Sequence, residues 1–330
     1  MARPEIHRLD PQAATPGGRL AISGSGFDVR LGHVPAVVLG GVKARVVRAS
    51  SRQLVVELAE STPGGPQSLA IEGVDGATLV VVVATVLTTS VHQVDSPVFD
   101  GQGRLYATLS GQRGQQTPVS VFRIGSDGSR EPLVTEVGNA TSLAFDHEGR
   151  LHVSSRFEGT VSRLNTDGEL EKVAGDLGVA CGLAFAADGE LLVGDRSGSI
   201  HRVARDGRSR LFASIPPSIA AFHLAIDADG SLVVAAPTLN SCDPLYRVSP
   251  EGEVSRWIEG FGRPQGVAFD PQGRLHVVDA LAGDSGVYRI DAAGQRELVV
   301  SGAGLLGVAF DPTDGAMAVC TDETIYRIAP

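Results

Sequence analysis

The sequence predicts an all-β protein in which a small immunoglobulin-like sandwich precedes a six-bladed β-propeller. Three observations support this prediction. A motif recurs about every forty residues, Gly turn signals lie inside each copy, and the first segment of the chain follows a different rhythm. The chain has 330 residues and 41 glycines, and its apolar residues show no helical periodicity. A period near forty residues is typical of four-stranded blades arranged radially.

Residues 1–83 are predicted to form the sandwich. Short alternating strands are separated by Pro and Gly turns, and one hairpin is centred on the pair Gly40-Gly41. About seven such strands suit a small immunoglobulin-like domain. The segment resembles the TIG (IPT) family through Pro4, Ile6, Pro11, Gly17-Gly18, Ile22 and Gly24-Ser25-Gly26-Phe27. The resemblance implies a spacer or interaction module, and therefore a protein partner bound through this domain.

Residues 84–330 are predicted to form the propeller. An apolar strand, an Asp, a Gly turn and a second apolar strand recur six times. The residues that anchor the copies lie 46, 40, 41, 43 and 41 residues apart; they are Phe99, Phe145, Phe185, Ile226, Phe269 and Phe310. Each copy supplies one blade of four strands.

The sixth copy stops at Thr324–Pro330 and has no fourth strand. An unpaired blade edge favours aggregation, so another segment has to close the ring. Alignment with the second copy places Val86–Thr89 against Val134–Val137. We therefore predict that residues 84–91, just before the first blade, close the sixth blade.

Composition excludes some classes of function. The net charge of −10 argues against nucleic-acid binding, which needs a basic surface. The most apolar run, Thr78–Val86, is too short to span a membrane. The N-terminus lacks the apolar core of a signal peptide, which predicts a cytoplasmic protein, or a secreted or periplasmic one if a leader was removed. The three cysteines show neither disulfide nor metal spacing.

The loops predict two different faces of the propeller. Turns between first and second strands, and between third and fourth strands, are short and uniform; we call their side the short-turn face. The other connections vary in length and form the variable-loop face. Irregular loops on a rigid scaffold often carry function, so the expected pocket is a central funnel on the variable-loop face.

Two residues predict a polar group on the propeller axis. Three positions before each anchor, the blades hold a Ser or a Gly, except for His223. One position earlier stand Asp95, Thr141, Cys181, Phe222, Gln265 and Leu306. His223 either plugs the channel by bonding a backbone carbonyl or acts as a general base tuned by Asp95. The neighbouring Thr141, Cys181, Phe222 and Gln265 are candidate substrate contacts.

Three arginines occupy equivalent loops between second and third strands. Arg113, Arg156 and Arg196 lie in the first three copies. Converging guanidiniums would clamp a carboxylate or phosphate, which predicts a small anionic ligand. The alternative is that all three are solvated loop tips.

The repeats are similar to two propeller families. Gly273–Gly294 resembles the NHL repeat, while Asp95–Asp100 and Pro264–Leu275 resemble the gluconolactonase and senescence-marker-protein family. The second resemblance implies one divalent metal, such as calcium, held by a Glu, an Asn and an Asp. Those positions hold Asp95, Phe222 and Gln265, so Asp95 is the only matching ligand, and the resemblance leaves the metal site degraded.

Two functions follow from these observations. The first is a small-molecule-binding, lactonase-like hydrolase that acts on a small anionic or lactone substrate in the funnel without a certain cofactor. The second is a non-catalytic NHL-like scaffold that binds a ligand or a protein and uses the TIG domain for interaction. Propellers host many unrelated activities, so the repeat alone does not decide between them.

Overall fold

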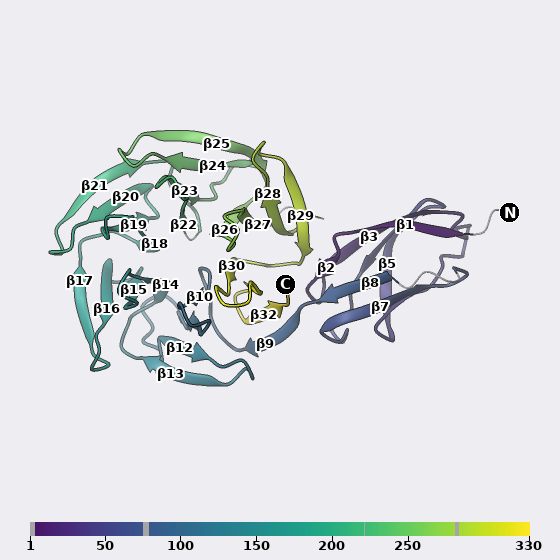
Figure 1. Ribbon diagram of the computed structural model, residues 1–330, viewed down its shortest axis with the longest axis horizontal. Coiled ribbons are helices and arrows are strands. Elements are labelled where there is room, and N and C mark those ends of the chain that lie inside the picture. The colour runs from purple at the N-terminus through teal and green to yellow at the C-terminus, as the bar shows by residue number, and fades with distance from the viewer. Residues whose placement is uncertain (1–3, 75–78, 221, 281–283) are drawn as a thin grey trace.

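The computed structural model describes residues 4–74, 79–220, 222–280 and 284–330. All regular elements in these residues are β-strands. The strands form a sandwich at one end of the molecule and a ring at the other (Figure 1). No helix in the described part of the chain has the length and apolar character needed to cross a membrane. The all-β prediction is confirmed.

The sandwich contains eight strands, and its core comes from alternation along each of them. The strands are β1 (Glu5–Asp10), β2 (Ala13–Ala14), β3 (Arg19–Ser25), β4 (Val37–Leu39), β5 (Val42–Ala49), β6 (Gln53–Glu57), β7 (Gly65–Ile71) and β8 (Leu79–Val83). In β3, Leu20 and Ile22 are buried while their neighbours are partly exposed. They pack with Leu54 and Val37 in one cluster. Period-two burial of this kind is expected for a half-buried strand.

The ring contains five separate four-stranded sheets. They are β10 (Val98–Phe99) to β13 (Arg130–Val134), β14 (Ala140–Phe145) to β17 (Leu170–Ala174), β18 (Ala180–Phe185) to β21 (Ser209–Ser214), β22 (His223–Ile226) to β25 (Val254–Phe261), and β30 (Gly307–Phe310), β31 (Met317–Cys320) and β32 (Thr324–Ile328) with β9 (Thr85–Thr89). The second and third strands of the first four sheets are β11 (Leu105–Thr108), β12 (Val121–Ile124), β15 (Leu151–Ser155), β16 (Thr160–Leu164), β19 (Leu191–Asp195), β20 (Ser199–Val203), β23 (Leu232–Ala235) and β24 (Asp243–Val248).

The prediction of six separate blades is wrong for the fifth repeat. Its strands, β26 (Pro264–Phe269), β27 (Leu275–Asp279), β28 (Gly286–Ile290) and β29 (Arg296–Ser301), belong to a twelve-stranded sheet that continues into the sandwich. The cause is β2, which pairs in parallel with β29 on one side and with β8 on the other. The outer edge of this repeat is therefore paired rather than open.

The predicted closure of the ring is confirmed. Strand β9 pairs with β32 in antiparallel register, so that Thr89 lies opposite Thr324 and Thr88 opposite Ile325. The strand between the sandwich and the first blade thus completes the last sheet. In Figure 1 it runs from the sandwich along the outside of the ring.

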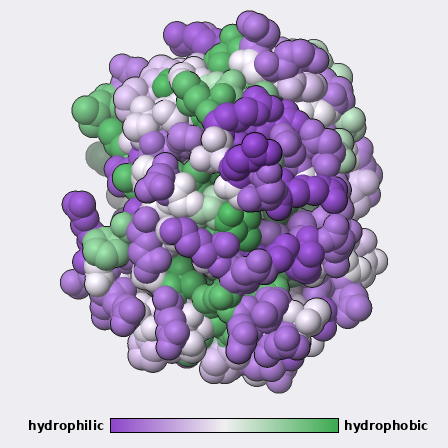
Figure 2. All heavy atoms as spheres, turned by 90° about the vertical axis from the view of Figure 1, so that its left-hand side faces the viewer, coloured by the Kyte–Doolittle hydropathy of each residue, from purple (hydrophilic) through white to green (hydrophobic). Residues whose placement is uncertain are grey.

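The innermost strands follow one another around the axis. Contacts run from β14 through β18, β22 and β26 to β30, and β30 also contacts β10. Each of these strands runs from the variable-loop face toward the short-turn face. The outer rim near β17 and β21 presents mainly hydrophilic side chains, with hydrophobic ones between them (Figure 2).

The short turns are held by a repeated Asp–Arg contact. In the second repeat, Asp146 accepts hydrogen bonds from the backbone N and the guanidinium of Arg150. Burial raises the pKa of Asp146, but these hydrogen bonds outweigh it, and the pKa lies below the ordinary value. The pairs Asp100–Arg104 and Asp270–Arg274 repeat the arrangement. These contacts therefore fix the conformation of three turns on the short-turn face.

Two buried histidines should make stability depend on pH. His152 and His276 pack edge-on or tilted against Phe185 and Phe310. Burial lowers the pKa of both imidazoles. Below pH about 6.5 the unfolded chain binds protons that the folded chain does not, so each histidine should cost up to about 1.4 kcal/mol per pH unit. Above that pH both forms are neutral and this stability is fully present.

Urea unfolding between pH 8 and pH 5 measures this effect. We expect the double variant His152→Gln/His276→Gln to show a flatter dependence than the wild type. The exposed His7 supplies the control, because His7→Gln should leave the slope unchanged. An unaltered slope in the double variant would assign the acid sensitivity to other groups.

Candidate functional site

The sequence-predicted pair, His223 and Asp95, meets on the axis. The Nδ1 atom of His223 lies 2.6 Å from Oδ1 of Asp95. The exposed fractions of the two residues are 1% and 6%. Their strands are separated around the ring by β14 and β18 on one side and by β26 and β30 on the other, so the imidazole reaches across the axis. The sequence could not decide between this contact and a backbone carbonyl; the partner is the carboxylate.

The pair leaves one polar atom without a partner. A carboxylate accepts hydrogen bonds when it is ionised, so Nδ1 of His223 is assigned as the donor of this contact. The same Asp95 oxygen also accepts a hydrogen bond from the backbone N of Ser96. Nε2 of His223 is buried and has no partner in the described part of the chain. An unsatisfied buried acceptor costs about 1–3 kcal/mol, which favours a ligand or water that can donate to it.

The ring is narrowest at the level of His223, where backbones approach closely. A Cβ on Gly307 would lie 2.5 Å from Cα of Ser96, and one on Gly182 would lie 2.0 Å from the carbonyl O of Phe222. Real Cβ atoms do not come this near, so these positions require Gly. Together with the imidazole, the backbones leave little room for a channel at this level.

An axial cavity of about 480 Å³ begins at this constriction. Asp95 and His223 line it, and every innermost strand contributes apolar wall residues. Its lining extends to the six repeat anchors, Phe99, Phe145, Phe185, Ile226, Phe269 and Phe310, and to His147. Since His147 belongs to a turn between first and second strands, the cavity opens toward the short-turn face.

This position corrects the predicted funnel on the variable-loop face. The physical reason is the crowding of the described backbones near His223, and the cavity that starts there extends along the strands toward the short-turn face. From the sequence, the six anchors were used to mark the repeats, but their place in the wall of the cavity was not predicted. His147 was also missed, although its turn is the one among the six that carries a His.

The prediction that Phe222 and Cys181 contact a substrate is wrong, because both side chains lie in the hydrophobic core. The exposed fraction of Phe222 is 0%, and both side chains belong to the cluster between the third and fourth blades. The ring of Phe222 lies on the backbone of Gly194, where a Cβ would approach it to 2.3 Å. Burial raises the pKa of the Cys181 thiol to about 12. A neutral, enclosed thiol does not act as a nucleophile.

The remaining predicted contacts lie at the variable-loop end of the innermost strands. Thr141 is buried and donates its hydroxyl to the carbonyl O of Asn139. Gln265 is buried. Neither residue lines the axial cavity. Thr141 therefore serves the fold of its loop, and a ligand contact through Gln265 stays a prediction.

The three predicted arginines do not form one group. Arg113 is exposed, on a loop whose backbone is held by Asn139 through Gly114 and Gln112. Arg156 and Arg196 are partly buried and within electrostatic reach of each other. None of the three lines the axial cavity.

The site does not fit the divalent metal implied by the sequence resemblance. Asp95 is engaged by His223 and Ser96, and Phe222 has its ring in the core. Gln265 offers one neutral oxygen at most. Within residues 4–74, 79–220, 222–280 and 284–330, no three His, Cys, Asp or Glu side chains come together as metal ligands. Calcium and magnesium need more hard oxygen ligands than these positions supply.

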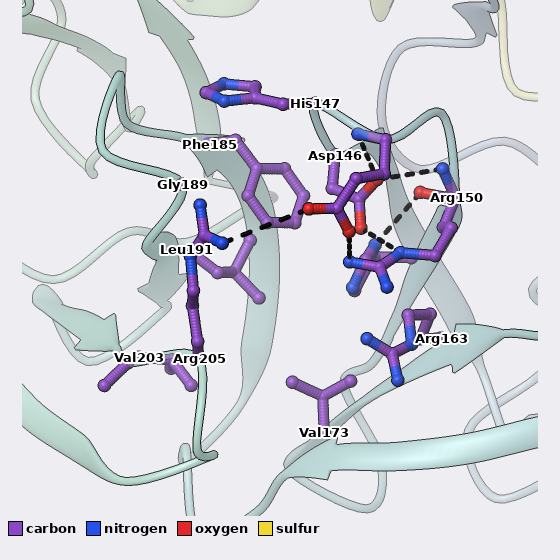
Figure 3. A pocket seen from close by; sticks show the side chains of 13 residues that line it. Asp146, His147, Arg150, Arg163, Val173, Phe185, Gly189, Leu191, Val203 and Arg205 are labelled. Carbon is purple, nitrogen blue, oxygen red and sulfur yellow. Dashed lines mark hydrogen bonds and ion pairs between the residues drawn. The ribbon is translucent and has the colours of Figure 1, made fainter.

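A smaller pocket of about 240 Å³ lies between the second and third blades on the short-turn face. Figure 3 shows the Asp146–Arg150 contact and Arg205 directed toward a carboxylate. That carboxylate is Glu148, which also pairs with Arg150. The charged lining thus satisfies itself, so this pocket offers little to a ligand. Phe185 and His147 line both this pocket and the axial cavity.

Comparison with known structures shows the same fold at low sequence identity. A structural-genomics target assigned as a gluconolactonase is 17% identical, with a TM-score of 0.60, over 74% of this chain and 91% of its own. An auxiliary nutrient binding protein from Bacteroides ovatus is 14% identical, with a TM-score of 0.57, over 100% and 98%. Virginiamycin B lyase from Staphylococcus aureus is 14% identical, with a TM-score of 0.50, over 73% and 87%. A comparison with curated proteins gave no significant match.

Two family models match the chain itself. Residues 4–80 match the IPT/TIG domain, which confirms the resemblance of the first segment. Residues 157–330, more than half of the chain, match the SMP-30/Gluconolactonase/LRE-like region. Together with the axial site and the ring of sheets, this match places the protein in the SMP-30/gluconolactonase family.

Proposed function

We propose that this protein binds a small, uncharged and largely apolar molecule, of the lactone class, in the axial cavity. The observation that carries the proposal is the His223–Asp95 contact at the inner end of that cavity, with Nε2 of His223 left without a partner. A volume of about 480 Å³ suits a small ligand.

The lining favours an uncharged ligand over the anionic one that was also expected. The walls are mainly apolar from the level of His223 to the anchors, with Ser96 and Ser142 near the inner end, and no Arg or Lys belongs to the lining. An anion placed there would lose its hydration without gaining a cationic partner. A cyclic ester instead presents a mainly apolar ring and one polar edge, which matches the walls and the inner end.

We further propose that the His223–Asp95 pair hydrolyses that ester without a metal, after a shift of the imidazole that opens the buried Nε2 to the cavity. With its proton on Nδ1, His223 has a lone pair on Nε2 that can accept a proton from water as the water oxygen bonds to the ester carbonyl carbon. The ring C–O bond then breaks, and the leaving oxygen takes the proton back from Nε2, which gives a hydroxy acid. Asp95 orients the imidazole and stabilises its transient positive charge.

The alternative is a binding protein without turnover. The similarity to the auxiliary nutrient binding protein extends over both domains, whereas the similarity to the gluconolactonase target covers the ring region. The paired edge between β2 and β29 gives the sandwich a fixed position, which suits an interaction module. Ligand binding in the axial cavity is common to both functions, and catalysis separates them.

Two lactones of different polarity test the proposal. We expect δ-decalactone, which has an alkyl chain, to bind more tightly than glucono-δ-lactone in isothermal titration calorimetry. Filling the wall with Ala225→Phe should abolish binding, while Ala225→Ser, the matched control, should preserve it. His223→Gln should retain lactone binding. It should lower the rate of hydrolysis, measured by proton release, by roughly 100-fold or more.

The outcomes distinguish the candidate functions. Binding without measurable turnover in the wild type would establish the non-catalytic alternative. Equal binding by the wild type and Ala225→Phe would place the ligand outside the axial cavity and refute the proposal.

A further inference from the structure

Arg156 and Arg196 occupy equivalent places in neighbouring blades on the variable-loop face. Each follows the last residue of a second strand, β15 and β19, and these last residues pair with the first residues of β14 and β18. Because β14 and β15 both contact β18, the two arginines lie on adjacent parts of the same rim. They are on the opposite side of the His223 constriction from the axial cavity.

Hydrogen bonds tie the two arginine loops together. The backbone N of Leu177 donates to Gly159 O over 3.0 Å, and the backbone N of Arg196 donates to Val179 O over 3.3 Å. Asp195 Oδ1 accepts a hydrogen bond from Val179 N over 2.8 Å. The segment 177–179 therefore lies between the loops and fixes both of them.

The two side chains lack the acidic partners that other arginines of the ring have. Arg104, Arg150 and Arg274 each pair with an Asp. In the described part of the chain, the guanidinium of Arg156 makes no hydrogen bond or ion pair, and Nε of Arg196 is buried without a partner. A different guanidinium nitrogen of Arg196, Nη2, donates a hydrogen bond to the backbone O of Ile219 over 2.7 Å. Among the described residues, neither of these two neighbouring guanidiniums thus has an ion-pair partner.

Neighbouring acidic groups do not supply the missing charge. Asp195 directs its carboxylate to Val179 N and to the backbone N and hydroxyl of Ser197, and among the described residues it forms no ion pair with either arginine. Cys181 lies within electrostatic reach of both arginines, but burial raises its pKa to about 12, so the thiol is neutral. Burial, and then the charge of Arg196, lower the pKa of Arg156. A partly buried cation without a counter-charge costs stability that a bound anion would restore.

We propose that Arg156 and Arg196 form a second ligand site, which binds the carboxylate or phosphate group of a small anion on the variable-loop face. Guanidiniums bind such oxyanions through paired charge-assisted hydrogen bonds. The fixed loops hold both groups ready, and Arg196 Nε gains the acceptor that it lacks. This site is independent of the axial cavity and of any lactone chemistry there.

Calorimetric titration of the full chain with inorganic phosphate and with gluconate, at constant ionic strength set by chloride, tests the site. We expect saturable binding of at least one of the two anions, and the tighter one identifies the preferred oxyanion. Arg156→Gln and Arg196→Gln should each weaken it by about 10-fold or more. The exposed Arg113→Gln is the matched control and should leave binding unchanged, as should His223→Gln.

Thermal melting separates a binding role from a structural one. Arg156→Met should melt at a higher temperature than the wild type without phosphate or gluconate, because it removes an uncompensated charge. Loss of binding together with a lower melting temperature in both Arg156 variants would assign this arginine to the fold and overturn the proposal. So would the absence of phosphate and gluconate binding in the wild type.

Discussion

A chain that begins at Ser96 should fail to form a stable monomeric ring. It lacks β9, whose pairing with β32 completes the last sheet. It also loses Val91 and Leu87, which pack with Ile325 and Leu105 in one core cluster. Each fully buried aliphatic side chain contributes about 1.5–3 kcal/mol. The exposed edge of β32 would in addition invite pairing between molecules.

Size-exclusion chromatography with thermal melting followed by circular dichroism measures this effect. A chain that begins at Ala84 is the matched control, because it keeps β9 and loses the pairing of β2 with β29. We expect it to fold with reduced stability. If the chain from Ser96 is monomeric and melts cooperatively near the wild-type temperature, β9 is not required for closure.

Phe222→Ala should destabilise the protein by about 3–5 kcal/mol, because it empties a fully enclosed aromatic site. The ring packs between the third and fourth blades with Leu192 and Ile200. Its replacement by Asn, the residue type expected from the family's metal site, should be at least as destabilising. An Asn there would bury an amide among apolar side chains.

Chemical denaturation of Phe222→Ala and Phe222→Asn tests this prediction. Phe157, with an exposed fraction of 56%, provides the control, and Phe157→Ala should change stability by less than about 0.5 kcal/mol. Calcium titration of Phe222→Asn should show no binding. A stable Phe222→Ala variant with weakened lactone binding would return this residue to the ligand site.

The repeat pattern made the ring and its closure predictable. Each copy carries its own strand and turn signals, and the sixth copy visibly lacks a fourth strand, so the missing partner had to come from elsewhere in the chain. The same alignment placed His223 and Asp95 near the axis, at neighbouring positions of their repeats, but it could not decide whether the two side chains meet. The closure and this placement are consequences of periodicity, which a sequence records directly.

The continuous sheet between the sandwich and the fifth repeat could not be predicted. It depends on β2, which contains the two residues Ala13 and Ala14. A segment this short has no alternation to detect, and its pairing with Val300 and Ser301 is decided by how the domains dock. Tertiary contact, rather than local propensity, forms this strand.

The orientation of Phe222 escaped prediction for a local reason. Counting back from the anchor residue assumes strict alternation, but β14, β18 and β26 change register near their first residues. The strand β22 begins at His223 without such a shift. A bulge alters the side of the strand to which neighbouring side chains point. Residues at the same sequence distance from their anchors therefore do not always point in the same direction.

The pairing of β9 with β32 also sets an order of events during synthesis. Strand β9 leaves the ribosome directly after the sandwich, whose last strand ends at Val83, whereas β32 is made only after the other strands of the ring. Domains can fold as they emerge, so the sandwich can be complete while the ring is still open. The final sheet forms only once β32 has been made, and until then a nascent chain exposes the edge of β9 to chaperones and to other chains.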